Sequence, residues 1–159
     1  MKKIIQLLYL IPAIALSQIT SFDELKQVNS KDQFFKISIE NGFEKVSEES
    51  VNKGKGLMIS YAHKLSQDKK NANQFFWWIE NSAVGNSWML TLADEELYSE
   101  LLKSINTECE FSAVVNYYFN DMVCYSCAEL EAVIGVYKDD GYGHVNRFTF
   151  EEYQKILEN

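Results

Sequence analysis

The sequence predicts an α+β fold with an antiparallel β-sheet of about six to eight strands in two blocks. Helices pack with this sheet at the N-terminus, in the middle and at the C-terminus. Three observations predict it: signatures of helix N-caps recur along the chain, strand-like apolar runs lie between them, and short turn sequences separate the runs. The 159 residues, 47% of them hydrophobic, suffice for one ordinary domain with a substantial core.

The first seventeen residues have the layout of an export signal. A basic start is followed by a mostly apolar run and then by Ala15-Leu16-Ser17, which offers small side chains for cleavage. The run is too short for a spanning helix, so we expect no stable membrane insertion. We expect a bacterial-type signal peptide at residues 1–17 and a single α+β domain at residues 18–159. The mature protein would be secreted or periplasmic, and it lacks the initial cysteine of a lipoprotein.

The net charge disfavours some classes of partner. The formal net charge is −8 at pH 7, and it becomes two units more negative when Lys2 and Lys3 leave with the signal. Such a chain repels nucleic acid and anionic lipid, so we expect no nucleic-acid partner. A basic protein is the partner that the charge favours. The alternative is that the acidity only keeps an exported protein in solution.

Helix starts are marked by their caps. Ser21-Phe22-Asp23-Glu24, Ser30-Lys31-Asp32-Gln33 and Thr149-Phe150-Glu151-Glu152 each fit the capping box, in which the first side chain and the fourth bond to each other's backbone N–H. Asp94 can cap a further helix that is apolar on one side. The second helix is expected to end at Asn41-Gly42, because glycine tolerates the left-handed geometry of a helix end.

Strands are predicted between these helices. Residues 57–65 alternate between apolar and polar, whereas residues 75–79 and 88–92 are apolar at almost every position. The polar, charged segment from Glu48 to Lys55 is typical of a loop. In the second block we predict hairpin turns at Asn120-Asp121 and Asp139-Asp140-Gly141, between strands at residues 111–119, 122–127, 132–138 and 144–148.

Three cysteines in an oxidising compartment predict one disulfide and one thiol. With a hairpin turn at Asn120-Asp121, Cys109 and Cys127 share one side of the hairpin and Cys124 faces the other. We therefore predict a Cys109–Cys127 disulfide and a buried Cys124 thiol. A thioredoxin-type pair at Cys124 and Cys127 is disfavoured, because too few residues follow it and the mature chain has no proline. A zinc site with His144 would need Cys124 and Cys127 on one face of a strand, which their spacing does not allow.

No catalytic, metal or cofactor-binding residue is predicted. His63 lies on the apolar side of its predicted strand, which is typical of a structural histidine rather than a catalytic base. The sequence Asp139-Asp140-Gly141 lacks the later ligands of a calcium loop. No nucleophile motif or phosphate-binding loop occurs in the chain.

The aromatic strands carry the remaining signal. If the sheet is a single layer, Phe75, Trp77 and Met89 point away from the helices and form a possible binding surface. If both faces are covered, these side chains belong to the core. The chain is interpreted as a small, exported, non-catalytic protein that binds another protein, as an inhibitor or an immunity-type module does. The alternative is a small secreted enzyme that uses carboxylates or a thiol pair.

Overall fold

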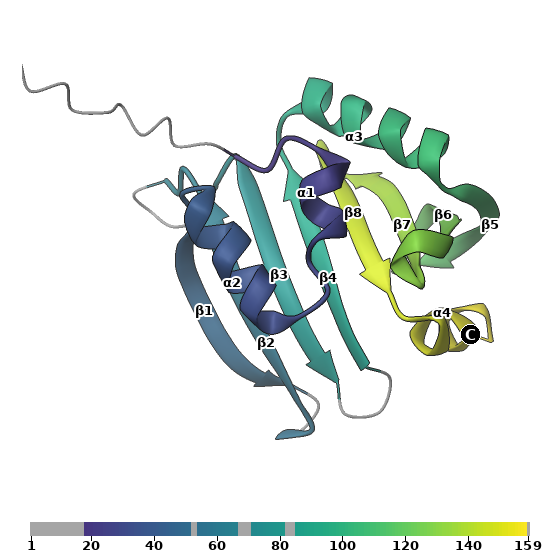
Figure 1. Ribbon diagram of the computed structural model, residues 1–159, viewed down its shortest axis with the longest axis horizontal. Coiled ribbons are helices and arrows are strands. Elements are labelled where there is room, and N and C mark those ends of the chain that lie inside the picture. The colour runs from purple at the N-terminus through teal and green to yellow at the C-terminus, as the bar shows by residue number, and fades with distance from the viewer. Residues whose placement is uncertain (1–17, 52–53, 67–70, 82–84, 159) are drawn as a thin grey trace, which may run out of the picture.

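The computed structural model describes residues 18–158, except 52–53, 67–70 and 82–84 (Figure 1). The predicted signal peptide at residues 1–17 lies outside the described residues. Within them the chain forms one eight-stranded antiparallel sheet and four α-helices, which confirms the α+β prediction. Among the same residues, no helix is long and apolar enough to cross a membrane.

The sheet consists of two four-stranded meanders that meet at their last strands. Its order is β1-β2-β3-β4-β8-β7-β6-β5, and β4 pairs antiparallel with β8 at the centre. The first meander contains β1 (Glu44–Val51), β2 (Gly56–His63), β3 (Gln74–Asn81) and β4 (Gly85–Leu92). The second contains β5 (Glu110–Tyr117), β6 (Asn120–Cys127), β7 (Ala132–Asp139) and β8 (Tyr142–Phe148).

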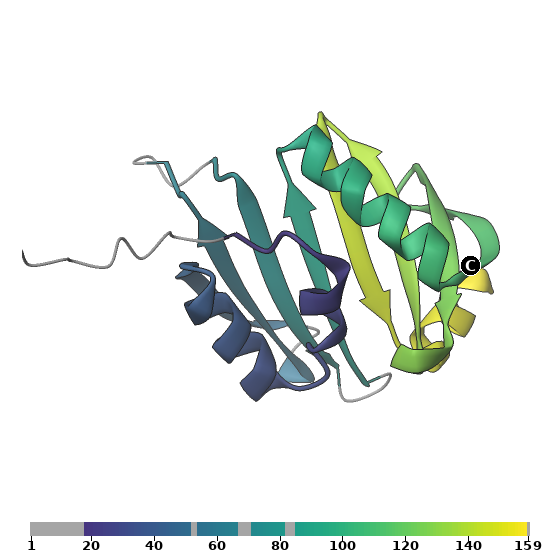
Figure 2. The ribbon, with the colours of Figure 1, turned by 45° about the horizontal axis from the view of Figure 1, so that its top comes forward.

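The helices cover the two faces of the sheet unequally. On one face lie α1 (Phe22–Lys26), α2 (Lys31–Glu40) and α3 (Glu95–Glu108), as Figure 2 shows. On the other face, α4 (Phe150–Leu157) packs over the second meander, where its Tyr153 joins a separate apolar cluster. The described helices therefore leave most of the outer face of β1–β4 uncovered, and α4 reaches it only at Ser87 of β4 (Figure 1).

The four predicted N-caps are present and explain where the helices begin, but of the three predicted capping boxes only that of Ser21 and Glu24 is complete. Ser21 Oγ accepts from the Glu24 N–H at 3.3 Å, and the Glu24 carboxylate accepts from the Ser21 N–H at 3.1 Å. Asp94 accepts from the N–H of Leu97 at 3.0 Å. At the end of α2, Gly42 has a φ of 68°, the left-handed conformation that the sequence predicts there.

The main core lies between the sheet and α1–α3. Phe34 of α2 packs against Phe76 and Trp78 of β3, with ring centroids 4.7 and 5.9 Å apart. Where α3 crosses β8, a Cβ on Gly143 would lie only 2.2 Å from Cδ2 of Tyr98. The absence of a side chain at Gly143 thus allows the Tyr98 ring to rest directly on the strand.

One strand contradicts the predicted loop at Glu48–Lys55. Glu44–Val51 forms β1, whose residues pair with β2 from Glu44↔Ala62 to Val51↔Gly56. This strand is the edge of the sheet and is mostly exposed, so it has no apolar alternation by which to recognise it. Its charges are the kind that protect an edge strand from pairing with another chain.

The predicted turn at Asn120-Asp121 is also wrong. Tyr117 pairs with Asn120, so the turn between β5 and β6 is Tyr118-Phe119, and both turn residues have positive φ (48° and 70°). Sequence rules favour Asn, Asp or Gly in such turns, and they therefore misplaced this one. The turn predicted at Asp139-Asp140-Gly141 is present as Asp140-Gly141, with φ values of 49° and 83°, while Asp139 pairs with Tyr142 as the last residue of β7.

The predicted pairing of cysteines is confirmed. Cys109, at the end of α3, forms a disulfide with Cys127, at the end of β6, and their Cα atoms lie 4.6 Å apart. Cys124 is a buried free thiol on the other side of β6. The disulfide ties α3 to the second meander and is compatible with an oxidising compartment.

Candidate functional site

Strand alternation divides the aromatic residues of β3 between two environments. Phe76 and Trp78 point into the core and are 0% exposed. Phe75 and Trp77 point to the opposite side, are half-buried, and stack with ring centroids 5.3 Å apart and planes inclined by 25°. These two rings lie on the face of the sheet that α1–α3 do not cover.

Neighbouring strands extend this surface. The register pairs Trp77 with Ser60 of β2 and with Met89 of β4, so all three side chains share one face. The predicted residues Phe75, Trp77 and Met89 are therefore brought together by the fold. We call the outward, half-buried apolar residues of β2–β4 the open face: Met58, Phe75, Trp77, Ile79 and Met89.

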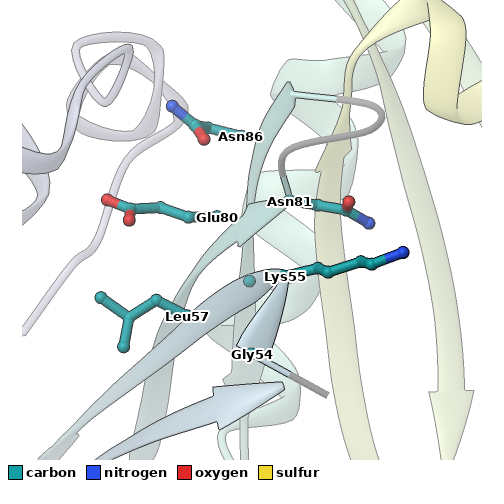
Figure 3. A pocket seen from close by; sticks show the side chains of 7 residues that line it. Gly54, Lys55, Leu57, Glu80, Asn81 and Asn86 are labelled. Atoms are coloured by element: carbon teal, nitrogen blue, oxygen red, sulfur yellow. The ribbon is translucent and has the colours of Figure 1, made fainter. Parts of the chain in front are cut away.

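The charge on this side of the first meander is negative. Glu44 and Glu49 of β1 pair with Ala62 and Met58 and thus lie on the same side as the open face. Within β1–β4 the register places no described lysine or arginine on this side, and Lys55, just before β2, points to it near the ends of β2–β4 (Figure 3). A positively charged partner would therefore meet carboxylates at the β1 rim of the open face.

A pocket of about 210 Å³ adjoins the open face, at the place where α4 begins to cover the sheet. Ile79 and Met89 belong both to the open face and to the pocket. Its polar lining comes from four parts of the fold: Ser87 of β4, Asn146 of β8, Glu152 of α4, and the tyrosines Tyr117, Tyr118 and Tyr137 of the second meander.

Among the described residues, Glu152 is the one carboxylate that lines this pocket. Its backbone N–H donates to the Thr149 cap at 3.1 Å, while its side chain leaves the cap and accepts from the Ser87 hydroxyl at 3.4 Å. Oε2 of Glu152 is buried and has no hydrogen-bond partner among the described residues. Burial raises the pKa of this carboxyl, and its hydrogen bonds and two nearby positive charges oppose the rise.

A second polar group in the pocket is also unsatisfied. Asn146 is only 3% exposed, and its Nδ2 has no hydrogen-bond partner within the described part of the chain. Burial raises the pKa of Tyr137, while a side-chain interaction with Asn146 lowers it. Burial likewise raises the pKa of Tyr117, so both phenols stay protonated at neutral pH. The pocket thus combines neutral hydroxyls, the Asn146 amide beside Tyr137, and one carboxylate oxygen that has no hydrogen-bond partner among the described residues.

Neither histidine is placed as a catalytic base. His144 is hydrogen-bonded through Nδ1 to the Thr91 hydroxyl at 2.9 Å and stacks on Tyr137 at 4.5 Å between centroids. Burial lowers the pKa of His144, so the ring is neutral at pH 7. His63 is 1% exposed and packs against Phe43 in the core, which agrees with the structural role expected for it.

Another surface hollow lies at the ends of β2–β4, but its side chains do not converge. Leu57, Glu80 and Asn86 point to one side of the sheet, whereas Asn81 and Lys55 point to the other (Figure 3). The Glu80 carboxylate is already engaged with Lys31, at 3.2 Å. This hollow therefore has no common point at which a ligand would meet several polar groups.

Sequence reasoning named the open face but missed the pocket. Glu152 was recognised only as the last residue of a predicted capping box, and its actual partner, Ser87, is 65 positions away in the chain. Among the described residues, no three His, Cys, Asp or Glu side chains are grouped as a metal site requires. Comparison with models of protein families, with curated proteins and with solved structures found no match for this chain.

Proposed function

We propose that this protein is exported and works without catalysis, by binding a basic protein on the open face. The observation that carries the proposal is the stacked pair Phe75 and Trp77, which lies half-buried on a sheet face that no described helix covers. Large aromatic side chains in an uncovered apolar surface are the usual anchors of protein interfaces.

The chemistry of the surroundings supports a cationic partner. Glu44 and Glu49 lie at one rim of the open face, and Glu152 lies at the opposite side, in the pocket. The whole chain has a formal charge of −8, so a basic protein would be attracted from a distance as well as at the contact. Burial of the aromatic side chains would contribute most of the binding free energy. The carboxylates would favour a positively charged partner over a neutral or acidic one.

A small secreted enzyme is the weaker alternative. A redox pair at Cys124 and Cys127 is unavailable, because Cys127 is bonded to Cys109 and Cys124 is a buried thiol. The pocket is lined by a single carboxylate, Glu152, whereas acid–base catalysis by carboxylates commonly uses two. The disulfide supports export, because such bonds persist in oxidising compartments.

Capture from the native extracellular or periplasmic fraction tests the proposal. The wild-type protein should retain a basic protein, and the capture should weaken as salt is added. Trp77→Ala should lose it. The matched control is Ile39→Ala, since Ile39 is 67% exposed on α2, on the opposite face of the sheet. Equal capture by both variants, or capture of an acidic protein that is insensitive to salt, would overturn the proposal.

A further inference from the structure

The pocket beside the open face contains polar groups whose hydrogen bonds a ligand could complete. Two of its polar atoms, Glu152 Oε2 and Asn146 Nδ2, are buried without hydrogen-bond partners among the described residues. A buried polar group left unpaired costs stability, and such groups are rare in folded proteins unless they serve a purpose. Both residues line the same hollow, so a ligand that displaces the side chains around these buried atoms could satisfy both.

The carboxylate defines what the ligand must offer. Oε2 of Glu152 can only accept, so the ligand needs an N–H or O–H donor. A positively charged donor also gains the Coulomb attraction of the carboxylate, which a neutral donor lacks. The basic residues closest in sequence are committed elsewhere: Arg147 donates to the Asn86 carbonyl at 3.2 Å, and Lys155 lies 3.4 Å from Glu151. Both cations still attract the Glu152 carboxylate, but Oε2 receives no hydrogen bond from any described residue and can accept one from a ligand.

The walls of the pocket favour an organic cation over a bare metal ion. Tyr117, Tyr118 and Phe148 line it, and aromatic faces attract ammonium and guanidinium groups. A divalent metal ion would need several oxygen ligands, whereas the described part of the chain brings one carboxylate to the hollow. A volume of about 210 Å³ accommodates an extended basic side chain.

We propose that this pocket binds an organic cation with N–H donors, the end group of a lysine or arginine side chain, through Glu152 and the surrounding aromatic rings. The ammonium or guanidinium group donates to Glu152 Oε2, and a carbonyl of the attached backbone accepts from Asn146 Nδ2. As an anchor for the partner, the pocket rests on the proposed function, because the cation would then be a side chain of the basic protein on the open face. Its affinity for a cation can nevertheless be measured without any partner.

Small probes test the pocket directly. N-acetyl-lysinamide, N-acetyl-argininamide and N-acetyl-norleucinamide are titrated into the ¹⁵N-labelled protein, and amide shifts are mapped by NMR. Norleucine keeps the aliphatic chain of lysine but lacks the charged donor. We expect the lysine probe, the arginine probe or both to shift the resonances of Ser87, Asn146 and Glu152 in a saturable way, with norleucine at least about tenfold weaker.

Two adjacent glutamates provide the matched variants. Glu152→Gln keeps the shape of the side chain and should weaken cation binding at least about tenfold. Glu151→Gln removes an exposed carboxylate one residue earlier and should leave binding unchanged. Spectra that are otherwise unaltered will show that both variants are folded. Equal binding of norleucinamide, equal weakening by both variants, or the absence of saturable shifts would overturn the inference.

The same measurements separate this inference from the proposed function. If the pocket binds a cation but the open face captures no basic protein, the proposed function fails and the pocket stands. If a basic protein is captured equally by the wild type and by Glu152→Gln, and no cation probe binds, the pocket inference fails and the open face stands.

Discussion

The Ser87 hydroxyl donates to Oε1 of Glu152 across 3.4 Å and ties the first turn of α4 to β4. Glu24 occupies the equivalent position in α1, yet its carboxylate turns back to the Ser21 N–H at 3.1 Å and completes the capping box. The same sequence motif thus has two outcomes. Glu24 satisfies its own helix, whereas Glu152 is drawn towards the sheet and leaves one oxygen free in the pocket.

Replacing Glu152 by glutamine should remove a pH-dependent loss of stability. Burial raises the pKa of Glu152, so in the window above 4.5 the folded state binds more protons than the unfolded state. The contribution of Glu152 to the free energy of unfolding then falls as the pH rises from 4.5 through the raised pKa. Glu152→Gln cannot ionise and should lack this fall, which makes it at least as stable as the wild type at pH 7. Urea unfolding between about pH 4 and 8 measures the difference.

Glu151→Gln serves as the control for this experiment. Its carboxylate is exposed and lies 3.4 Å from Lys155, a surface pair of the kind that contributes little to stability. The free energy of unfolding of Glu151→Gln should therefore depend on pH in the same way as that of the wild type. A Glu152→Gln profile that also follows the wild type would show that the carboxyl is solvated and that the pocket carries no buried charge.

The Cys124 thiol should resist alkylation in the folded protein. Burial raises the pKa of Cys124 to about 11, so at pH 8 only about one thiol in a thousand is ionised, and the thiolate is the reactive form. Mass spectrometry after iodoacetamide treatment should find no adduct on the folded protein and one adduct after unfolding without reductant. Three adducts in that unfolded sample would contradict the Cys109–Cys127 disulfide.

Most helices and strands could be predicted because their signals are local. The caps at Ser21 and Asp94 find their hydrogen-bond partners three residues further along the chain. The cysteine pairing was also predicted, even though the turn was misplaced. Moving the turn from Asn120-Asp121 to Tyr118-Phe119 does not by itself change which side each residue faces. The register shift between Phe111 and Ala113, which the sequence did not predict, is what brings Cys109 opposite Cys127.

What escaped prediction depends on contacts between distant segments. Edge strand β1 is held by backbone pairing with β2 and has a charged sequence with no apolar period. The pocket is assembled from both meanders and α4, and its two unpartnered atoms become evident only when Glu152 meets Ser87 and Asn146 is buried between strands. No spacing within the sequence predicts that Ser87 and Glu152, which are 65 positions apart, come into contact.

Replacing Phe119 by glycine should stabilise the protein. Phe119 is 97% exposed, so it contributes little packing, and its φ of 70° is a left-handed conformation that costs a side-chain-bearing residue about 1–2 kcal/mol. Urea unfolding should show a gain of about 1 kcal/mol for Phe119→Gly. Phe111→Gly is the control, because Phe111 is also exposed but lies in strand β5, where glycine destabilises. A loss in both variants would argue against strain at the turn.

The neighbouring residues Trp77 and Trp78 should differ sharply when each is replaced by alanine. Trp78 is 0% exposed, packs on Phe34, and donates from Nε1 to Glu80 at 3.2 Å, so Trp78→Ala should cost about 3–5 kcal/mol. Trp77 is half-buried and loses mainly its stack with Phe75, a pair worth about 0.5–1.5 kcal/mol. Denaturant unfolding of both variants compares these costs. If Trp77→Ala costs as much as Trp78→Ala, Trp77 belongs to the core, and the open face loses the anchor on which partner binding depends.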